Sequence, residues 1–286
     1  MQLNGKTVLI TGANAGIGFE TAKDMAKRNA RVLMLCRDHE KGERVRRKII
    51  FETGNPEVIL KIADLSSMKS VRAVAEKINR EEANLHILIN NAGSAEGKKT
   101  MTEEGLEYTY ATNHFGPFLL TNLQLDLLRR SAPSRVVVVS SFLHRYGKIE
   151  LDNLCAEKSF PILPVMWYNN TKLANVMFIW QLLVRIKSFP GIYTCALEPG
   201  IIMTNFQSRL GLLTKFIVPF LRLIAKSEEE GAQTTIYAAV SPEAMTYGGY
   251  FSNCEQANRL GHPDSYNADM CAQLWCASEK ITGLVQ

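Results

Sequence analysis

Short apolar runs recur along the chain, and most are followed by a longer segment with helical periodicity. The runs are rich in Val, Ile and Leu and lack polar alternation, which indicates strands buried on both faces. Alternation of such strands with helices predicts an α/β fold with a parallel sheet and right-handed crossovers. The predicted strands are Thr7–Ile10, Arg31–Cys36, Val58–Ala63, Leu85–Ile89, Arg135–Val139, Ile192–Leu197 and Tyr250–Phe251.

The organisation of the 286 residues indicates a single domain. No linker rich in Pro, Gly or Ser divides the chain, and no internal repeat is visible. We expect a Rossmann fold over 1–286, a doubly wound parallel sheet of about seven strands with helices on both faces. Helices are predicted near 17–29, 38–53, 67–82, 103–131 and 166–188. Two long excursions, 142–166 and 201–226, follow strand ends, where open α/β folds build substrate pockets. We therefore predict a substrate lid over 201–226.

Charge, cysteine content and hydropathy exclude several function classes. The net charge is +5, and basic clusters such as Arg44–Lys48 lie in helical patterns, which favours solvated helix faces over nucleic-acid binding. The six cysteines form no C-x-x-C pair and no cluster with metal-ligand spacing, so no metal site is expected. No apolar stretch reaches the ~18 residues that span a bilayer, and a strand pattern begins almost at once. We expect reduced thiols and a cytoplasmic location.

A glycine-rich loop joins the first predicted strand to a helix. Its sequence, Thr11-Gly12-Ala13-Asn14-Ala15-Gly16-Ile17-Gly18, has the spacing G-x-x-x-G-x-G. Glycines there allow a tight turn and close approach, and the helix N-terminus offers free N–H groups to a pyrophosphate. The strand–helix context favours a dinucleotide site over a simple turn. The residues expected at the cofactor in this loop are Gly12, Asn14, Ala15, Gly16, Ile17 and Gly18.

Residues at the ends of the next strands extend the predicted cofactor site. Arg37 and Asp38 follow the second strand, where an arginine pairs with the 2′-phosphate of NADP and a carboxylate with the ribose of NAD. Asp38 is placed to cap the next helix, so NADP(H) is favoured over NAD(H). Asp64 and Leu65, after the third strand, are placed to contact adenine, although Asp64 also suits a helix cap. After the fourth strand, the segment expected to line the cofactor floor holds Asn91, Ala92 and Gly93.

Tyr168 and Lys172 are the candidate proton-transfer residues. Their i,i+4 spacing places them on one face of a helix, where the ammonium is expected to lower the tyrosine pKa. A tyrosine of this kind exchanges a proton with a carbonyl or alcohol oxygen. The fifth strand delivers the hydroxyls of Ser140 and Ser141 to the same sheet edge, where one can stabilise the reacting oxygen. Asn113, in a long helical region, is reasonable if it holds a water that links Lys172 to solvent.

The ordered set of motifs resembles the short-chain dehydrogenase/reductase family over essentially the whole chain. The resemblance rests on the glycine loop, Asp64, Asn90–Gly93, Asn113, the serine pair, Tyr168-x-x-x-Lys172 and Pro199-Gly200. It implies an Asn–Ser–Tyr–Lys tetrad at Asn113, Ser141, Tyr168 and Lys172. Ser140 stays open as an alternative to Ser141, because the Ser141–Tyr168 gap is longer than in most of the family. Around the nicotinamide we expect Tyr168, Lys172 (which can reach the ribose), Pro199, Gly200, Ile201 through its backbone, and Thr204.

Several segments are similar to retinol dehydrogenases and to the dehydrogenase domain of WW-domain oxidoreductases. These segments are Cys36–Asp38, Ser140–His144, Lys172–Asn175 and Gly248–Phe251. The similarity implies an oxidoreductase that uses NADP(H) on a small hydrophobic alcohol, aldehyde or ketone of retinoid, steroid or isoprenoid type. Glu198 departs from it, because these relatives usually have histidine there, which changes the expected polarity of this loop or pocket. His144 either contacts substrate or makes ordinary hydrogen bonds, and the second is favoured.

Other hypotheses stay open beside this one. A cofactor-binding sensor or scaffold without catalysis is the alternative function, although an intact tetrad argues against it. The lid either packs over the pocket, which is favoured, or dips into lipid as a peripheral membrane contact. A homodimer is suggested by analogy with relatives alone.

Overall fold

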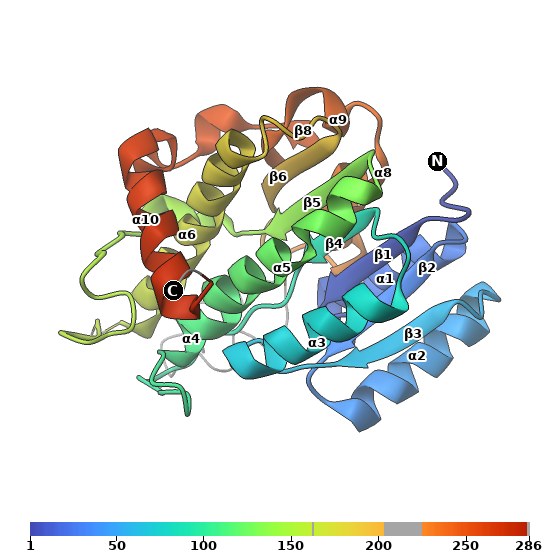
Figure 1. Cartoon of the computed structure of the whole chain (residues 1–286), viewed down its shortest axis with the longest axis horizontal. Helices are drawn as coiled ribbons and strands as arrows, with labels where there is room; N and C mark the ends of the chain where they lie inside the picture. Colours follow the sequence, from blue (N-terminus) through green and yellow to red (C-terminus); the bar gives the residue numbers. More distant parts are fainter. Residues whose placement is uncertain (162, 203–224, 285–286) are drawn as a thin grey trace.

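Eight strands join one sheet in the order β3-β2-β1-β4-β5-β6-β7-β8 (Figure 1). The computed structural model describes residues 1–161, 163–202 and 225–284. Strands β1 to β7 pair in parallel, and β8 pairs antiparallel with β7. The predicted doubly wound parallel sheet is confirmed, with one short antiparallel strand added at its edge. The strands are β1 (Thr7–Thr11), β2 (Arg31–Cys36), β3 (Val58–Ile62), β4 (Ile87–Asn90), β5 (Ser134–Val139), β6 (Ile192–Glu198), β7 (Gly249–Ser252) and β8 (Glu255–Gln256).

Helices cover both faces of this sheet, as the sequence predicts. One apolar cluster lies between the sheet and α3, α5, α6 and α10, and a second lies between the sheet and α1, α2 and α8. These layers can be followed in Figure 1, where α3 and α5 cross in front of the strands. The helices are α1 (Gly16–Lys27), α2 (His39–Thr53), α3 (Met68–Glu81), α4 (Tyr108–Tyr110), α5 (Gly116–Arg130), α6 (Pro164–Arg185), α8 (Glu228–Val240), α9 (Ala244–Tyr247) and α10 (Ala268–Thr282).

The helical region predicted over 103–131 begins later and is not uniform. Its first turn is α4, the π-helical segment η1 (Ala111–Phe115) follows, and α5 completes it. The predicted start at residue 103 is wrong, because Met101 and Glu107 form a β-bridge across a turn before α4. Helices α8, α9 and α10 also lie beyond the predicted set. None of the helices in the described parts of the chain has the length and apolar character needed to cross a membrane.

The strand order fixes where a ligand site can form. The sheet grows outward in both directions from β1 and β4, which makes this pair the topological switch point. Ligands of open α/β sheets bind beyond the carboxyl ends of the strands at such a point. The loops after β1, β4, β5 and β6, which carry the predicted site residues, all leave this edge of the sheet.

Candidate active site

Lys172 is a buried lysine at the centre of the site. It lies in α6, one turn after Tyr168, and its side chain runs back toward the end of β5. Its Nζ donates a 2.9 Å hydrogen bond to the Val139 carbonyl and lies 5.5 Å from the centroid of the Tyr168 ring. The residue is 3% exposed, and burial lowers the pKa of Lys172 to about 8. At neutral pH this ammonium is therefore still charged and lies close to the phenol.

The pKa of Tyr168 departs from the expectation in the free protein. Burial raises it above the ordinary value, and a hydrogen bond with the Ser141 hydroxyl lowers it only in part. The predicted net lowering by Lys172 is wrong for this state, because desolvation of the phenolate outweighs the neighbouring groups. Tyr168 is consequently a protonated phenol at neutral pH.

The two serines after β5 have different partners. Ser140 is buried, and its Oγ donates a 2.8 Å hydrogen bond to the backbone carbonyl of Lys172. Ser141 is the N-cap of the 3₁₀ segment η2 (Phe142–Tyr146), where it accepts a hydrogen bond from Leu143 N, and its hydroxyl also forms a hydrogen bond with Tyr168. The structure therefore brings Ser141 to the tyrosine, while the hydroxyl of Ser140 is engaged in holding α6.

Asn113 lies inside the π-helical segment and is completely buried. Its Oδ1 accepts a 2.7 Å bond from Ser94 N, and its Nδ2 donates to Ser94 O and to Thr171 Oγ1 at 2.8 and 3.0 Å. These bonds join the helix to the loop after β4 and to α6, next to Lys172. An amide is suited to this place because it donates and accepts at once. Single-turn π-helical bulges occur frequently at functional sites.

The glycine loop is shaped by close backbone contacts. Gly12 and Gly16 have φ of +66° and +56°, in the region that favours glycine. A Cβ on Gly18 would lie 2.3 Å from Gly12 O and 2.5 Å from Asn91 Nδ2, so no side chain fits there. The N-cap of α1 is Ala15, and no side chain caps the helix. Within the described residues, the first N–H groups of α1 therefore receive no cap from the N-cap side chain, and Asn14 and Ile17 flank them partly exposed.

The segment after β4 is bonded to the glycine loop and reaches Lys172. Thr11 Oγ1 accepts hydrogen bonds from the backbone N–H groups of Asn91 and Ala92, and Asn91 Nδ2 donates to Thr11 O. A Cβ on Gly93 would lie 3.4 Å from Lys172 Nζ. The predicted support of the neighbouring strand is therefore seen, and the segment leads to the lysine.

The loops that follow β2 and β3 carry the remaining residues predicted to bind the cofactor. Asp38 caps α2 by accepting from Lys41 N at 2.9 Å, which confirms the predicted cap, while exposed Arg37 bonds to the Tyr108 hydroxyl. Asp64 accepts from the backbone and hydroxyl of Ser66 at 2.8 and 2.7 Å.

Asp64 does not cap α3, which was the alternative role considered for it. The cap of α3 is Ser67, whose side chain accepts from Ser70 N. Leu65 is buried, and its carbonyl lies against Gly116, where a Cβ would come within 2.2 Å of the oxygen.

The segment after β6 approaches the site from the other side. Gly200 has φ +88°, and the Lys226 side chain packs over it, at 3.1 Å from the position of a Cβ. Pro199 precedes this turn, and Ile201 O accepts from Lys226 N at 2.8 Å. Thr204 and most of the predicted lid, 203–224, lie outside the described residues.

A group of buried polar residues is connected to the backbone of Ser141, and sequence patterns alone do not reveal it. His144, Tyr250 and Glu198 are all under 10% exposed and connect to one another by hydrogen bonds. The ordinary hydrogen bonding favoured for His144 is seen here. The sequence marks Glu198 only as a polar departure from its relatives. No spacing in the sequence shows that β7 brings Tyr250 to this position.

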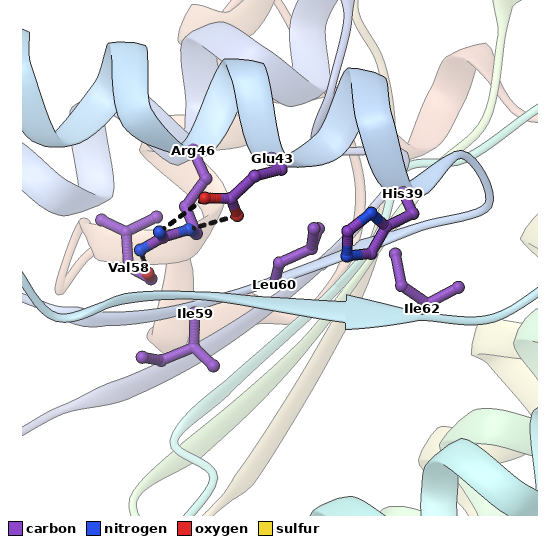
Figure 2. A pocket seen from close by; sticks show the side chains of 7 residues that line it. All are labelled: His39, Glu43, Arg46, Val58, Ile59, Leu60 and Ile62. Carbon is purple, nitrogen blue, oxygen red and sulfur yellow. Dashed lines mark hydrogen bonds and ion pairs between the residues drawn. The ribbon is translucent and has the colours of Figure 1, made fainter.

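A separate groove lies at the outer edge of the sheet and contains none of these side chains. It measures about 280 Å³ and lies between α2 and β3 (Figure 2). Arg46 crosses it, bonding to Glu43 and to Val58 O. The remaining lining residues are His39, Ile59, Leu60 and Ile62. The groove is a feature of the sheet edge, apart from the catalytic candidates.

The residues at the switch point fit a dinucleotide cofactor. The N-terminus of α1 has no cap from its N-cap side chain, Gly18 has no room for a side chain, and Arg37 is an exposed cation after β2. After β4, Gly93 lies next to Lys172, and a Cβ on this glycine would lie 3.4 Å from Lys172 Nζ. Among the described residues, no three His, Cys, Asp or Glu side chains gather to hold a metal ion.

Comparison with known proteins agrees with this geometry. The family model described as short chain dehydrogenase matches residues 6–212. Retinol dehydrogenase 12 of Homo sapiens is 41% identical over 288 residues, covering 99% of this chain and 88% of its own.

Among solved structures, an uncharacterised protein from Mycobacterium paratuberculosis is 31% identical with a TM-score of 0.78, covering 99% of this chain and 95% of its own. The L-sorbose reductase of Gluconobacter frateurii, solved with NADPH and L-sorbose, shares the fold at 20% identity. Its TM-score is 0.70, and the match covers 88% of this chain and 96% of that one.

Proposed function

The chain belongs to the short-chain dehydrogenase family, and from this premise we propose that it is an NADP(H)-dependent oxidoreductase of hydrophobic alcohols and carbonyl compounds. The proposed substrates are small molecules of retinoid, steroid or isoprenoid type. The relative named retinol dehydrogenase 12 supports this class, as do three exposed apolar side chains from the elements that carry Ser141 and Tyr168, namely Tyr146, Leu163 and Met166.

The observation that carries the proposal is the arrangement of Tyr168, Ser141 and Lys172. The hydroxyls of Tyr168 and Ser141 form a hydrogen bond, and Lys172 Nζ lies 5.5 Å from the centroid of the phenol ring. A bound nicotinamide supplies or accepts the hydride at the substrate carbon. Tyr168 gives its proton to the substrate oxygen in reduction and takes it back in oxidation. Ser141 donates a hydrogen bond to that oxygen, and Lys172 stabilises the phenolate.

Tyr168 is a phenol at neutral pH, so it holds the proton that a carbonyl oxygen needs in reduction. Oxidation of an alcohol instead starts from the phenolate, which the Lys172 ammonium stabilises.

The preference for NADP(H) over NAD(H) rests on the end of β2. The Asp38 carboxylate is engaged as the N-cap of α2, whereas the Arg37 guanidinium is exposed beside Tyr108. A free carboxylate would select the ribose hydroxyls of NAD, and a guanidinium pairs with the 2′-phosphate of NADP.

Two further parts of the proposal concern partners. The lid over 201–226 is proposed to pack over the substrate pocket, with peripheral membrane contact as the alternative, and a homodimer is proposed by analogy with relatives. Flotation with lipid vesicles tests the alternative role of the lid, and sedimentation equilibrium tests the homodimer.

The enzyme assay measures NADPH consumption with a panel of apolar aldehydes and ketones. Wild-type protein is expected to turn over at least one of them, and Tyr168→Phe is expected to bind NADPH but lose turnover. Tight NADPH binding without turnover of any substrate would instead support the cofactor-binding sensor or scaffold. Faster turnover with NADH than with NADPH would contradict the cofactor assignment.

A further inference from the structure

A chain of buried polar side chains runs from the end of β6 to the backbone of Ser141. Glu198 accepts hydrogen bonds from Ser252 Oγ at 2.7 Å and from the Tyr250 hydroxyl at 3.1 Å. The Tyr250 oxygen lies 3.3 Å from His144 Nδ1, and the two rings pack with centroids 4.9 Å apart. His144 Nδ1 lies 2.7 Å from the Ser141 carbonyl oxygen. The chain thus ends on the residue that touches Tyr168.

The chemistry of these groups fixes the direction of the hydrogen bonds. A carbonyl oxygen only accepts, so His144 Nδ1 must carry the hydrogen that bonds to Ser141. Tyr250 gives its own hydrogen to Glu198, which leaves its oxygen to accept weakly from the same Nδ1–H. Burial lowers the pKa of His144, which keeps the ring neutral. Its Nε2 is buried and has no hydrogen-bond partner among the described residues.

Burying these polar groups lowers the stability of the folded protein. A histidine with no exposed surface and a carboxylate that is 7% exposed both lose hydration. Glu198 recovers part of it from Tyr250, Ser252 and the Arg145 guanidinium at 3.1 Å. His144 recovers less, because its second ring nitrogen is unsatisfied. Such groups are often retained at functional sites, where polar networks fix a geometry.

The chain of hydrogen bonds ends at the peptide group of Ser141. The Ser141 hydroxyl takes part in two hydrogen bonds in the free protein. It accepts one from Leu143 N at 3.2 Å and forms the other with Tyr168. The Ser141 carbonyl also accepts from His144 N at 3.0 Å, so the ring Nδ1–H is a second donor that further restricts rotation of this peptide and the direction of the Ser141 side chain. We propose that His144, held by Tyr250 and Glu198, is a positioning residue that keeps the Ser141 hydroxyl aligned with Tyr168. This inference rests on the proposed oxidoreductase function.

Two substitutions at His144 separate positioning from packing. In His144→Asn the amide Nδ2 occupies the place of the ring Nδ1 and can still donate to Ser141 O. His144→Leu fills similar space without a donor. We expect His144→Leu to lower kcat about 10-fold to 100-fold with KM changed less than about 3-fold, because displacement of a catalytic group acts on the chemical step. His144→Asn is expected to recover most of this loss.

Two further variants complete the comparison. Tyr250→Phe removes the link to Glu198 and is expected to lower kcat less than His144→Leu does. His86→Leu removes a histidine that accepts from Thr7 N at the amino end of the sheet, and kcat is expected to stay at the wild-type value. Equal kcat values for His144→Asn and His144→Leu would overturn the proposal. A change in KM with kcat unchanged in His144→Leu would overturn it too.

A readout without turnover keeps this test independent of the proposed function. Histidine ¹⁵N NMR of the whole protein at neutral pH reports which ring nitrogen carries the hydrogen. We expect one neutral histidine, absent in His144→Asn, to have its hydrogen on Nδ1, and Tyr250→Phe to shift that resonance. Hydrogen on Nε2 of His144 would overturn the proposed hydrogen bond even if the enzyme is active. Absence of turnover in wild-type protein with the Nδ1 form present would count against the proposed function alone.

Discussion

The Ser140 hydroxyl donates a 2.8 Å hydrogen bond to the backbone carbonyl of Lys172, which leaves the neighbouring Ser141 to bond with Tyr168. We expect Ser141→Ala to lower kcat about 10²-fold, because it removes a donor to the reacting oxygen. Ser140→Ala removes a buried hydrogen bond and is expected to lower the free energy of unfolding by about 1 kcal/mol, with a smaller loss of kcat. Steady-state kinetics and urea unfolding of both variants compare the two. If Ser140→Ala lowers kcat more than Ser141→Ala does, with the free energy of unfolding unchanged, then Ser140 rather than Ser141 is the catalytic serine.

Burial of Lys172 makes stability depend on pH. Its pKa falls to about 8 in the folded protein, whereas an unfolded lysine keeps its proton to about 10.4. Between these values the unfolded state binds more protons, so the cost of burying this group decreases and stability rises as pH rises from about 8 to about 10.4. We expect the unfolding free energy of wild type minus that of Lys172→Met to increase with pH across this range. A flat or falling difference in urea unfolding would contradict the buried lysine.

The same titration affects catalysis in the opposite direction. Loss of the ammonium above about pH 8 removes the charge that stabilises the Tyr168 phenolate. We expect kcat/KM for carbonyl reduction to fall as pH rises through this value, while Tyr168 itself stays protonated. Measuring kcat/KM between about pH 6 and pH 10 checks this expectation, because kcat/KM reports the pKa values of the free enzyme. A rate that increases through pH 8 would exclude this role of the lysine.

The strands and the order of the site motifs follow from local sequence, but several determinants do not. Runs such as Val136–Val139 are apolar throughout because helices cover both faces of the sheet, so their pattern identifies them. Asp38 could be predicted as a cap because capping depends on the next three residues. Helix α8 carries a capping box at Ser227 and Glu230, yet its buried face is largely Ala, Gly and Thr, which gives weak helical periodicity.

The geometry around the tetrad depends on contacts between distant residues. The π-helical turn at Asn113 accompanies bonds to Ser94 and Thr171, which lie 19 and 58 residues away. The raised pKa of Tyr168 depends on burial, which the i,i+4 spacing with Lys172 does not reveal. Residue types and order therefore identify the chemistry, while protonation states and the partners of each serine require the folded chain.

The Gly18 position tolerates no side chain, because a Cβ would lie 2.3 Å from the Gly12 carbonyl oxygen. We expect Gly18→Ala to weaken NADPH binding at least about 10-fold and to lower the unfolding free energy by about 1–3 kcal/mol through overpacking. Gly42→Ala is the matched control, since its Cβ would meet the tip of the Leu60 side chain at 2.8 Å, which can rotate away. Calorimetric titration with NADPH and thermal unfolding measure both effects. Unchanged NADPH affinity in Gly18→Ala would place the pyrophosphate elsewhere.

Arg37 is expected to determine cofactor choice because its guanidinium is exposed after β2, whereas Asp38 is occupied as a helix cap. A hydrogen bond to a charged group contributes roughly 1.5–3 kcal/mol, so Arg37→Met is expected to raise the Kd for NADPH about 10-fold to 100-fold. The Kd for NADH should hardly change, since NADH lacks the 2′-phosphate. Arg44→Met removes the same charge from the exposed face of α2 and serves as control. If Arg37→Met weakens NADPH and NADH binding equally, or if Arg44→Met matches its effect, general attraction rather than recognition of the 2′-phosphate explains the binding.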